Sequence, residues 1–215
     1  MKSVPCILVV VLVASAAAAQ SEEPATIKHT AEDVIALFTF EDRSKLKVTA
    51  EPTRVRPGTY WTKDIQLFQK DDRDRVWEMR STKQFGSVKV VMVAPGQEKI
   101  LDMGPPIGMV LISRTGQNVP PGIVRFTLGV VGRSSESYYP GAFLAGKKPP
   151  APALRITDPD GKVLETVRFN VTAAGACSFD WRYPKDFTGP FDVKIDPVMG
   201  PFKWELGKQG TFYVE

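Results

Sequence analysis

The chain is poor in the side chains that most active sites use. It contains one histidine, His29, and two cysteines, Cys6 and Cys177, among 215 residues. Histidine is the usual general base and the commonest metal ligand, so a single one near the N-terminus argues against a histidine-based triad or a zinc site. The sequence also lacks a glycine-rich phosphate loop, a dinucleotide fingerprint and a nucleophile elbow. We therefore expect no enzyme activity, no cofactor and no bound metal.

Long hydrophobic runs are also scarce, and the one present stands at the N-terminus. Lys2 precedes an apolar stretch that begins at residue 7 and ends with Ala17-Ala18-Ala19 directly before Gln20. A membrane-spanning helix needs about 20 apolar residues, and a shorter run that ends in a small-residue site is typical of a secretory signal. We expect cleavage after Ala19 and a secreted or periplasmic protein, with no stable membrane span after cleavage.

Neither the cysteines nor the charges point to a special site. Loss of the signal removes Cys6 and leaves Cys177 without a disulfide partner, and a lone cysteine in a strand pattern is usually a buried apolar residue. The chain has 28 basic and 24 acidic residues, a net charge of +4, but no basic stripe, so nucleic-acid binding is not expected. Arginines interrupt the acidic cluster at residues 71–78, which predicts a solvated loop rather than a calcium site.

Apolar and polar residues alternate along much of the sequence. Apolar residues recur at every second position over residues 124–130, 163–171, 179–183 and 191–195, with Glu165 as the one interruption. This is the period of a β-strand with one buried face, as in antiparallel sheets. Eighteen prolines and 17 glycines separate the runs with turns. We predict an all-β fold, an antiparallel sandwich, whose core contains Phe126, Leu128, Phe169, Trp181 and Val193.

Two stretches of the first half are less regular. Residues 30–38 fit a capped helix and a strand equally well, and both interpretations stay open. Trp61, Ile65 and Leu67 are expected to share one apolar face of a strand, although Lys63 interrupts the pattern.

The domain organisation is predicted from proline and glycine. Pro57-Gly58 and Pro121-Gly122 each stand between two strand patterns, and each is expected to close the first hairpin of a module. Pro105-Pro106 cannot continue a sheet ladder and marks the boundary between the modules. The expected parts are a signal peptide at 1–19, an N-terminal segment at 20–45, a small β module at 46–105 and a larger sandwich at 106–215.

The C-terminal half resembles the immunoglobulin-like, and more narrowly macroglobulin-like, sandwich domains of secreted proteins. The resemblance covers about residues 108–215 and is carried by "PPGIVRFTL", the Asp-Gly hairpin "ITDPDGKVLET", the strand pair "FDWRYPKDFTGPFDVKI" and the closing "GTFYVE". It implies an immunoglobulin-like sandwich with an adhesive or structural habit outside the cytoplasm, and it implies no catalytic residues.

A candidate binding surface lies in "SYYPGAFLAGKKPP", which is too rich in proline for a central strand. Tyr138 and Tyr139 offer flat apolar faces with polar tips, and Lys147 and Lys148 add positive charge for an acidic partner. The alternative is that one tyrosine plugs the end of the sandwich while the lysines keep the surface soluble. The function expected is non-enzymatic binding of a protein or an envelope polymer. A carbohydrate-binding module with exposed aromatics, or an enzyme of unrecognised type, remain the alternatives.

Overall fold

Strands make up almost all of the regular structure. The computed structural model describes residues 23–116, 118–196, 200–206 and 211–214, and the predicted signal at 1–19 lies outside these ranges. Within them the helical structure is a single 3₁₀ turn, η1 (Gly86–Lys89). The all-β prediction is confirmed. The same ranges hold no helix with the length and apolar character that crossing a bilayer requires.

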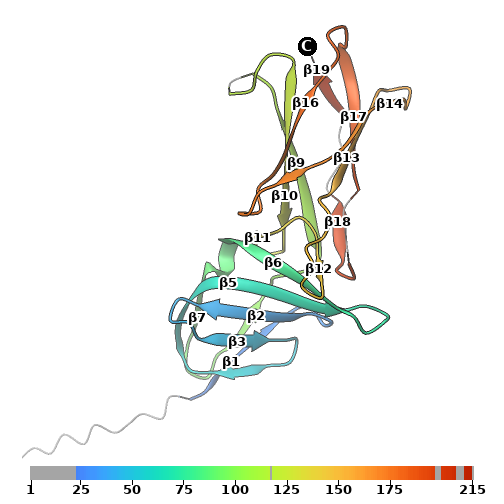
Figure 1. Ribbon diagram of the computed structural model, residues 1–215. Helices are drawn as coiled ribbons and strands as arrows, with labels where there is room; N and C mark the ends of the chain where they lie inside the picture. The colour runs from blue at the N-terminus through green and yellow to red at the C-terminus, as the bar shows by residue number, and fades with distance from the viewer. Residues whose placement is uncertain (1–22, 117, 197–199, 207–210, 215) are drawn as a thin grey trace, which may run out of the picture.

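The lower half of the fold in Figure 1 contains a small sheet and the larger part of a 12-stranded sheet that continues into the upper half. The smaller sheet has the order β4 (Thr53–Val55), β1 (Ala25–His29) and β8 (Glu98–Leu101). The larger one places β6 (Val76–Phe85), β5 (Gly58–Lys70), β2 (Ile35–Phe40) and β3 (Lys45–Val48) side by side. β7 (Val90–Val93) pairs with the first residues of β5.

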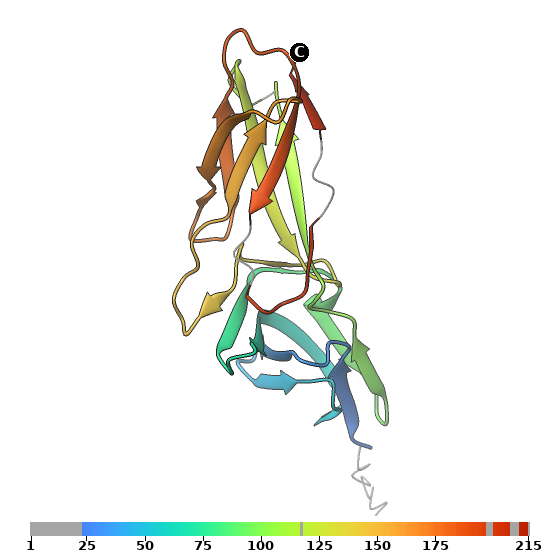
Figure 2. The same ribbon diagram turned by 90° about the vertical axis from the view of Figure 1, so that its right-hand side faces the viewer.

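The upper half contains two layers, which lie side by side in Figure 1 and one in front of the other in Figure 2. One has the order β15 (Asn170–Val171), β16 (Cys177–Arg182), β10 (Ile123–Val131), β9 (Ile107–Arg114) and β18 (Trp204–Leu206). The other has the order β14 (Val163–Arg168), β13 (Ala153–Thr157), β17 (Gly189–Asp196) and β19 (Thr211–Val214). The strand pairs are antiparallel except β1–β8 and β9–β18, which are parallel.

Aromatic rings from facing strands fill the space between the two upper layers. Trp181 of β16 packs against Phe191 of β17 with ring centroids 4.9 Å apart, and Phe126 of β10 meets Phe191 edge-on at 6.3 Å. The predicted core is confirmed, because all five of its members are buried: Phe126, Leu128, Phe169, Trp181 and Val193.

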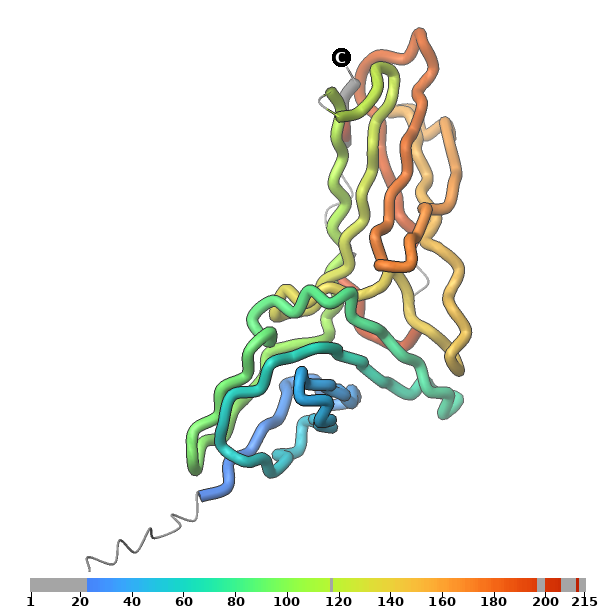
Figure 3. The backbone as a smooth tube through the Cα atoms, turned by 60° about the vertical axis from the view of Figure 1, so that its left-hand side comes forward, coloured from blue at the N-terminus to red at the C-terminus, as the bar shows by residue number. Residues whose placement is uncertain are grey.

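After β10 the chain returns to the lower half, which the boundary predicted at residues 105–106 does not anticipate. β11 (Glu136–Tyr138) and β12 (Phe143–Leu144) both pair with β6. Figure 3 shows this yellow segment running down beside the green and cyan strands of the lower half. We call residues 136–144, together with the part of β6 that they pair with, the seam.

The buried carboxylate of Glu136 joins the seam to Gly104, which lies where the chain passes from the lower half to the upper half. Glu136 Oε1 accepts hydrogen bonds from the Gly104 backbone N–H at 2.6 Å and from the Tyr138 hydroxyl at 3.0 Å. Burial raises the pKa of Glu136 above its usual value. Gly132 lies against this carboxylate so closely that an added Cβ would be 2.0 Å from Oε1. Glycine is therefore required at position 132 by packing.

The N-terminal segment predicted at 20–45 is part of the lower half. β1 pairs with β4 and β8, and β2 lies between β3 and β5. The helix interpretation of residues 30–38 is wrong, because β2 begins at Ile35 after a turn. The sheet supplies the backbone hydrogen bonds on both sides of this segment, which decides an otherwise balanced pattern in favour of the strand.

Two other local predictions for the first half are wrong. Trp61 does not share a face with Ile65 and Leu67: the pairing of β2 with β5 shifts by one residue next to Thr62, and this bulge turns Trp61 outward. Pro57-Gly58 does not close a hairpin, because β4 pairs with β1 and β5 pairs with β2, β6 and β7. Pro121-Gly122, in contrast, does precede the second strand of the β9–β10 hairpin.

The core predicts a large difference between two tryptophans. Trp181→Ala should lower the free energy of unfolding by about 3–5 kcal/mol, because its ring is 2% exposed and the cavity left behind cannot close fully. Trp61→Ala is the matched control, since that ring is 49% exposed and its loss should cost less than about 1 kcal/mol. Urea denaturation of both variants measures the difference, and equal losses would contradict the packing described here.

Candidate functional site

The outward side chains of β9, β10 and β16 form a continuous surface, which we call the outer face. Alternation along these strands sends every second residue into the core and leaves the others outside. The strand register places Ile112 beside Thr127 and Ser178, and Val110 beside Gly129. The outer face consists of Val110, Ile112 and Arg114 from β9, Arg125, Thr127 and Gly129 from β10, and Ser178, Asp180 and Arg182 from β16.

Two large aliphatic side chains stand exposed on this face. Val110 is 46% and Ile112 is 45% exposed, although the core takes the other side of the same strand. They lie two residues apart on β9 and therefore point the same way. Next to Val110, Gly129 has no side chain, so the apolar stripe is bordered by a strip of bare backbone.

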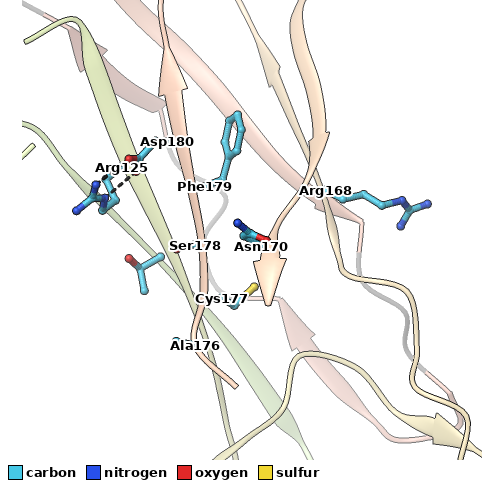
Figure 4. Close-up of a pocket in the computed structure, with 9 residues that line it drawn as sticks. Arg125, Arg168, Asn170, Ala176, Cys177, Ser178, Phe179 and Asp180 are labelled. Atoms are coloured by element: carbon cyan, nitrogen blue, oxygen red, sulfur yellow. Dashed lines mark hydrogen bonds and ion pairs between the residues drawn. The ribbon is translucent and has the colours of Figure 1, made fainter. Parts of the chain in front are cut away.

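A shallow hollow of about 540 Å³ adjoins this stripe. Its lining comes from β10, β15, β16 and the residues beside them: Arg125, Thr127, Arg168, Asn170, Ala176, Cys177, Ser178, Phe179 and Asp180. Figure 4 shows Arg125 and Asp180 joined on one side of β16, with Cys177 and Phe179 on the other. Arg168 extends away from that ion pair.

Arg125 and Asp180 form a two-pronged ion pair across β10 and β16. The guanidinium Nε and Nη2 each donate to one carboxylate oxygen at 2.7 Å. These hydrogen bonds lower the pKa of Asp180 and raise that of Arg125. Asp180 therefore stays ionised and does not serve as an acid or a base near neutral pH.

Cys177 lines the hollow with little reactivity. Its side chain is buried, and burial raises the pKa of the thiol to about 12. The thiolate is the nucleophilic form, so almost none is present at neutral pH. The interpretation of Cys177 as a buried apolar residue agrees with this position.

Tyr138 is not on the surface, and its place in the predicted binding surface is corrected. The side chain is 2% exposed and donates its hydroxyl to Glu136 within the seam. The pKa of this hydroxyl lies well above its usual value because of burial. The β6–β11 pairing, which joins residues far apart in sequence, is what covers Tyr138.

Tyr139 is partly buried, and the two lysines are exposed. The ring of Tyr139 meets Phe143 edge-on at 6.4 Å, and its hydroxyl donates to the Ala173 carbonyl, so this side chain also has a packing role. Lys147 and Lys148 follow a turn at the end of β12. The structure does not bring the four predicted residues together, and a binding role for the lysines stays a prediction.

The charged loop between β5 and β6 is organised by Asp71. Its carboxylate accepts hydrogen bonds from Trp77 Nε1 at 2.9 Å and from Arg75 Nε at 2.7 Å. The bond from Trp77 is the largest cause of the lowered pKa of Asp71. The Asp71 carboxylate is thus engaged in hydrogen bonds within its own loop. Across the described ranges, no three His, Cys, Asp or Glu side chains gather as metal ligands.

Exposed aromatics are few. Of the aromatic side chains whose exposure the structure describes, only Trp61 is more than about a third exposed. Its neighbours across β7 are Val90 and, on the diagonal, Met92. Sugar-binding platforms combine ring faces with several hydrogen-bonding groups, and a single tryptophan beside aliphatic residues gives weaker support for carbohydrate than for protein.

Val110 and Ile112 are the functional candidates that the sequence predictions missed. The signal was present in "MVLISR", where Val110, Ile112 and Arg114 alternate with Met109 and Leu111. Both sets are apolar, so the pattern does not say which one faces the core. The pairing with β10 decides it, because Met109 and Leu111 lie opposite the inward Val130 and Leu128.

His29 is buried in β1, and its titration should make the free energy of unfolding depend on pH. Its Nδ1 accepts the Ala31 N–H at 3.1 Å, its Nε2 has no partner within the described residues, and burial lowers its pKa below 6.5. The folded protein therefore binds this proton less readily than the unfolded chain. The free energy of unfolding should fall as the pH drops through about 6.5.

The variant His29→Asn tests this dependence. Asparagine can offer an oxygen acceptor to the Ala31 N–H and does not titrate. Thermal midpoints of both proteins, measured from about pH 7.5 down to about pH 5.5, should diverge, with the wild type losing more on acidification. Glu136 is present in both proteins, so its opposite contribution cancels. Parallel curves would contradict this, because they would mean that folding leaves the pKa of His29 unchanged.

The chain matches no protein-family model, no curated protein and no solved structure. The side chains that the fold exposes are therefore the basis for any functional proposal. Among them, the outer face combines an apolar stripe, a polar hollow and an ion pair on one surface.

Proposed function

We propose that the protein is a non-enzymatic binding protein that works outside the cytoplasm and docks a partner protein on the outer face. The observation that carries this proposal is the exposure of Val110 and Ile112 on a strand whose other side is in the core. Single exposed aliphatic residues are ordinary. Two on one face, beside bare backbone and rimmed by arginines and hydroxyl groups, have the make-up of a protein interface.

The position of the reactive groups supports binding over catalysis. Cys177, His29 and Glu136 are all buried, and each has a packing or hydrogen-bonding role. The charged groups of the hollow are two arginines and one aspartate, and Asp180 is neutralised by Arg125. An active site would instead bring together acidic and basic groups with pKa values shifted toward neutrality.

A photoreactive residue at position 112 tests the proposal. Ile112 is replaced by benzoylphenylalanine, and the purified protein is irradiated in an envelope extract of its native host. We expect a discrete, protease-sensitive adduct, because a partner seated on the outer face covers this side chain. Val163 is the matched control position, since it is 51% exposed but lies on β14 in the opposite sheet.

A second variant separates binding from folding. In Gly129→Val the new side chain fills the strip of bare backbone beside Val110. Gly129 lies outside the left-handed region, and an added Cβ would approach Val110 O at an ordinary 3.8 Å, so the fold should be kept. The adduct at position 112 should then disappear while the thermal midpoint stays unchanged. Identical adducts at positions 112 and 163, or none at either, would rule out this docking surface.

A further inference from the structure

One end of the outer face carries an excess of positive charge. Arg114 and Arg125 stand directly opposite each other in the β9–β10 pair. Asp180 flanks Arg125 on the far side, and Arg182 lies in the next row. Three arginines and one aspartate leave a charge of +2 on this end. The adjoining β9–β10 loop, residues 115–122, contains no charged residue to offset it.

Asp180, the one acidic residue at this end of the outer face, is already paired with Arg125. Both oxygens of Asp180 accept hydrogen bonds from Arg125. Arg114 makes no ion pair with any residue that the structure describes. Asp180 offsets the charge of Arg125 but not that of Arg114, so Arg114 is the guanidinium that is open to a carboxylate from outside.

We propose that the outer face binds an acidic, extended segment of its partner protein, a proposal that rests on the function proposed above. Arg114, Ile112 and Val110 follow one another at two-residue intervals along one side of β9. An extended chain has the same side-chain repeat. A partner strand lying along β9 therefore matches it with an acidic residue, then an aliphatic residue two positions on, and another two further.

The side chains favour protein over an anionic polymer. An arginine fork pairs with a carboxylate through two parallel hydrogen bonds, and a uronic or sulfated polysaccharide could supply the same anion. Such a polymer has no aliphatic side chains to cover Val110 and Ile112, which remain about half exposed without a partner. The apolar side chains of a polypeptide can cover these two residues and remove their surface from water.

Selection from a phage library of random nonamer peptides tests the proposal on the full protein. Peptides recovered on the wild type should be enriched in Asp or Glu followed, at the second and fourth positions beyond, by aliphatic residues. Recovery of these peptides should fall at least about tenfold on Arg114→Glu. Lys194→Glu is the matched control, because it reverses an exposed charge on β17, in the opposite layer of the upper half, and should leave recovery unchanged.

Three results would overturn the inference: enrichment without acidic residues, equal recovery on Arg114→Glu, or no enriched peptide at all. Retention of labelled hyaluronate by the wild type in the last case would identify an anionic polymer instead. Tryptophan emission confirms that each variant is folded. If the adduct at position 112 forms but is unchanged by Arg114→Glu, the docking surface stands and the acidic character of the partner fails.

Discussion

Glu136 lies where the two halves of the fold meet, and its buried carboxylate joins two segments that are distant in sequence. Gly104 belongs to the segment that leaves the lower half, and Tyr138 to the one that returns. Breaking either hydrogen bond would leave a buried polar group unsatisfied, at a cost of about 1–3 kcal/mol. Within the seam, the Arg80 guanidinium lies 4.2 Å from the centre of the Phe143 ring. These contacts hold the outer face in one orientation relative to the lower half.

The pairing of the layers also decides which side chains face outward. In a fold of paired layers without long helices, each strand gives one side to the core. The groups that chemistry would need, Cys177, His29 and Glu136, fall on that buried side or in the seam. What the strands of the upper half present outward is aliphatic, hydroxyl and arginine side chains. Such a surface recognises a partner by shape and charge, which is the basis of the function proposed.

Local patterns predicted the strands well and their neighbours poorly. The alternation around Phe126 and Val193 identified strands and their buried faces, and Asp160-Gly161 predicted a hairpin that Gly161 closes with a φ of +81°. The outward turn of Trp61 depends on a bulge set by its partner strand. Tyr138 was misplaced because β11 pairs with β6, more than 50 residues earlier in the chain. Pairings of that range are not encoded in any short window of sequence.

The most direct test of this account asks whether the two halves unfold together, because the contacts of the seam predict that they form one cooperative unit. The chain offers a reporter in each: His29, the single histidine, in the lower half, and the buried thiol of Cys177 in the upper half, with Cys6 replaced by Ser. Urea unfolding followed by the NMR signal of His29 and by labelling of Cys177 should give coincident curves. Two separate transitions would show that the halves are independent modules and that the seam does not hold them together.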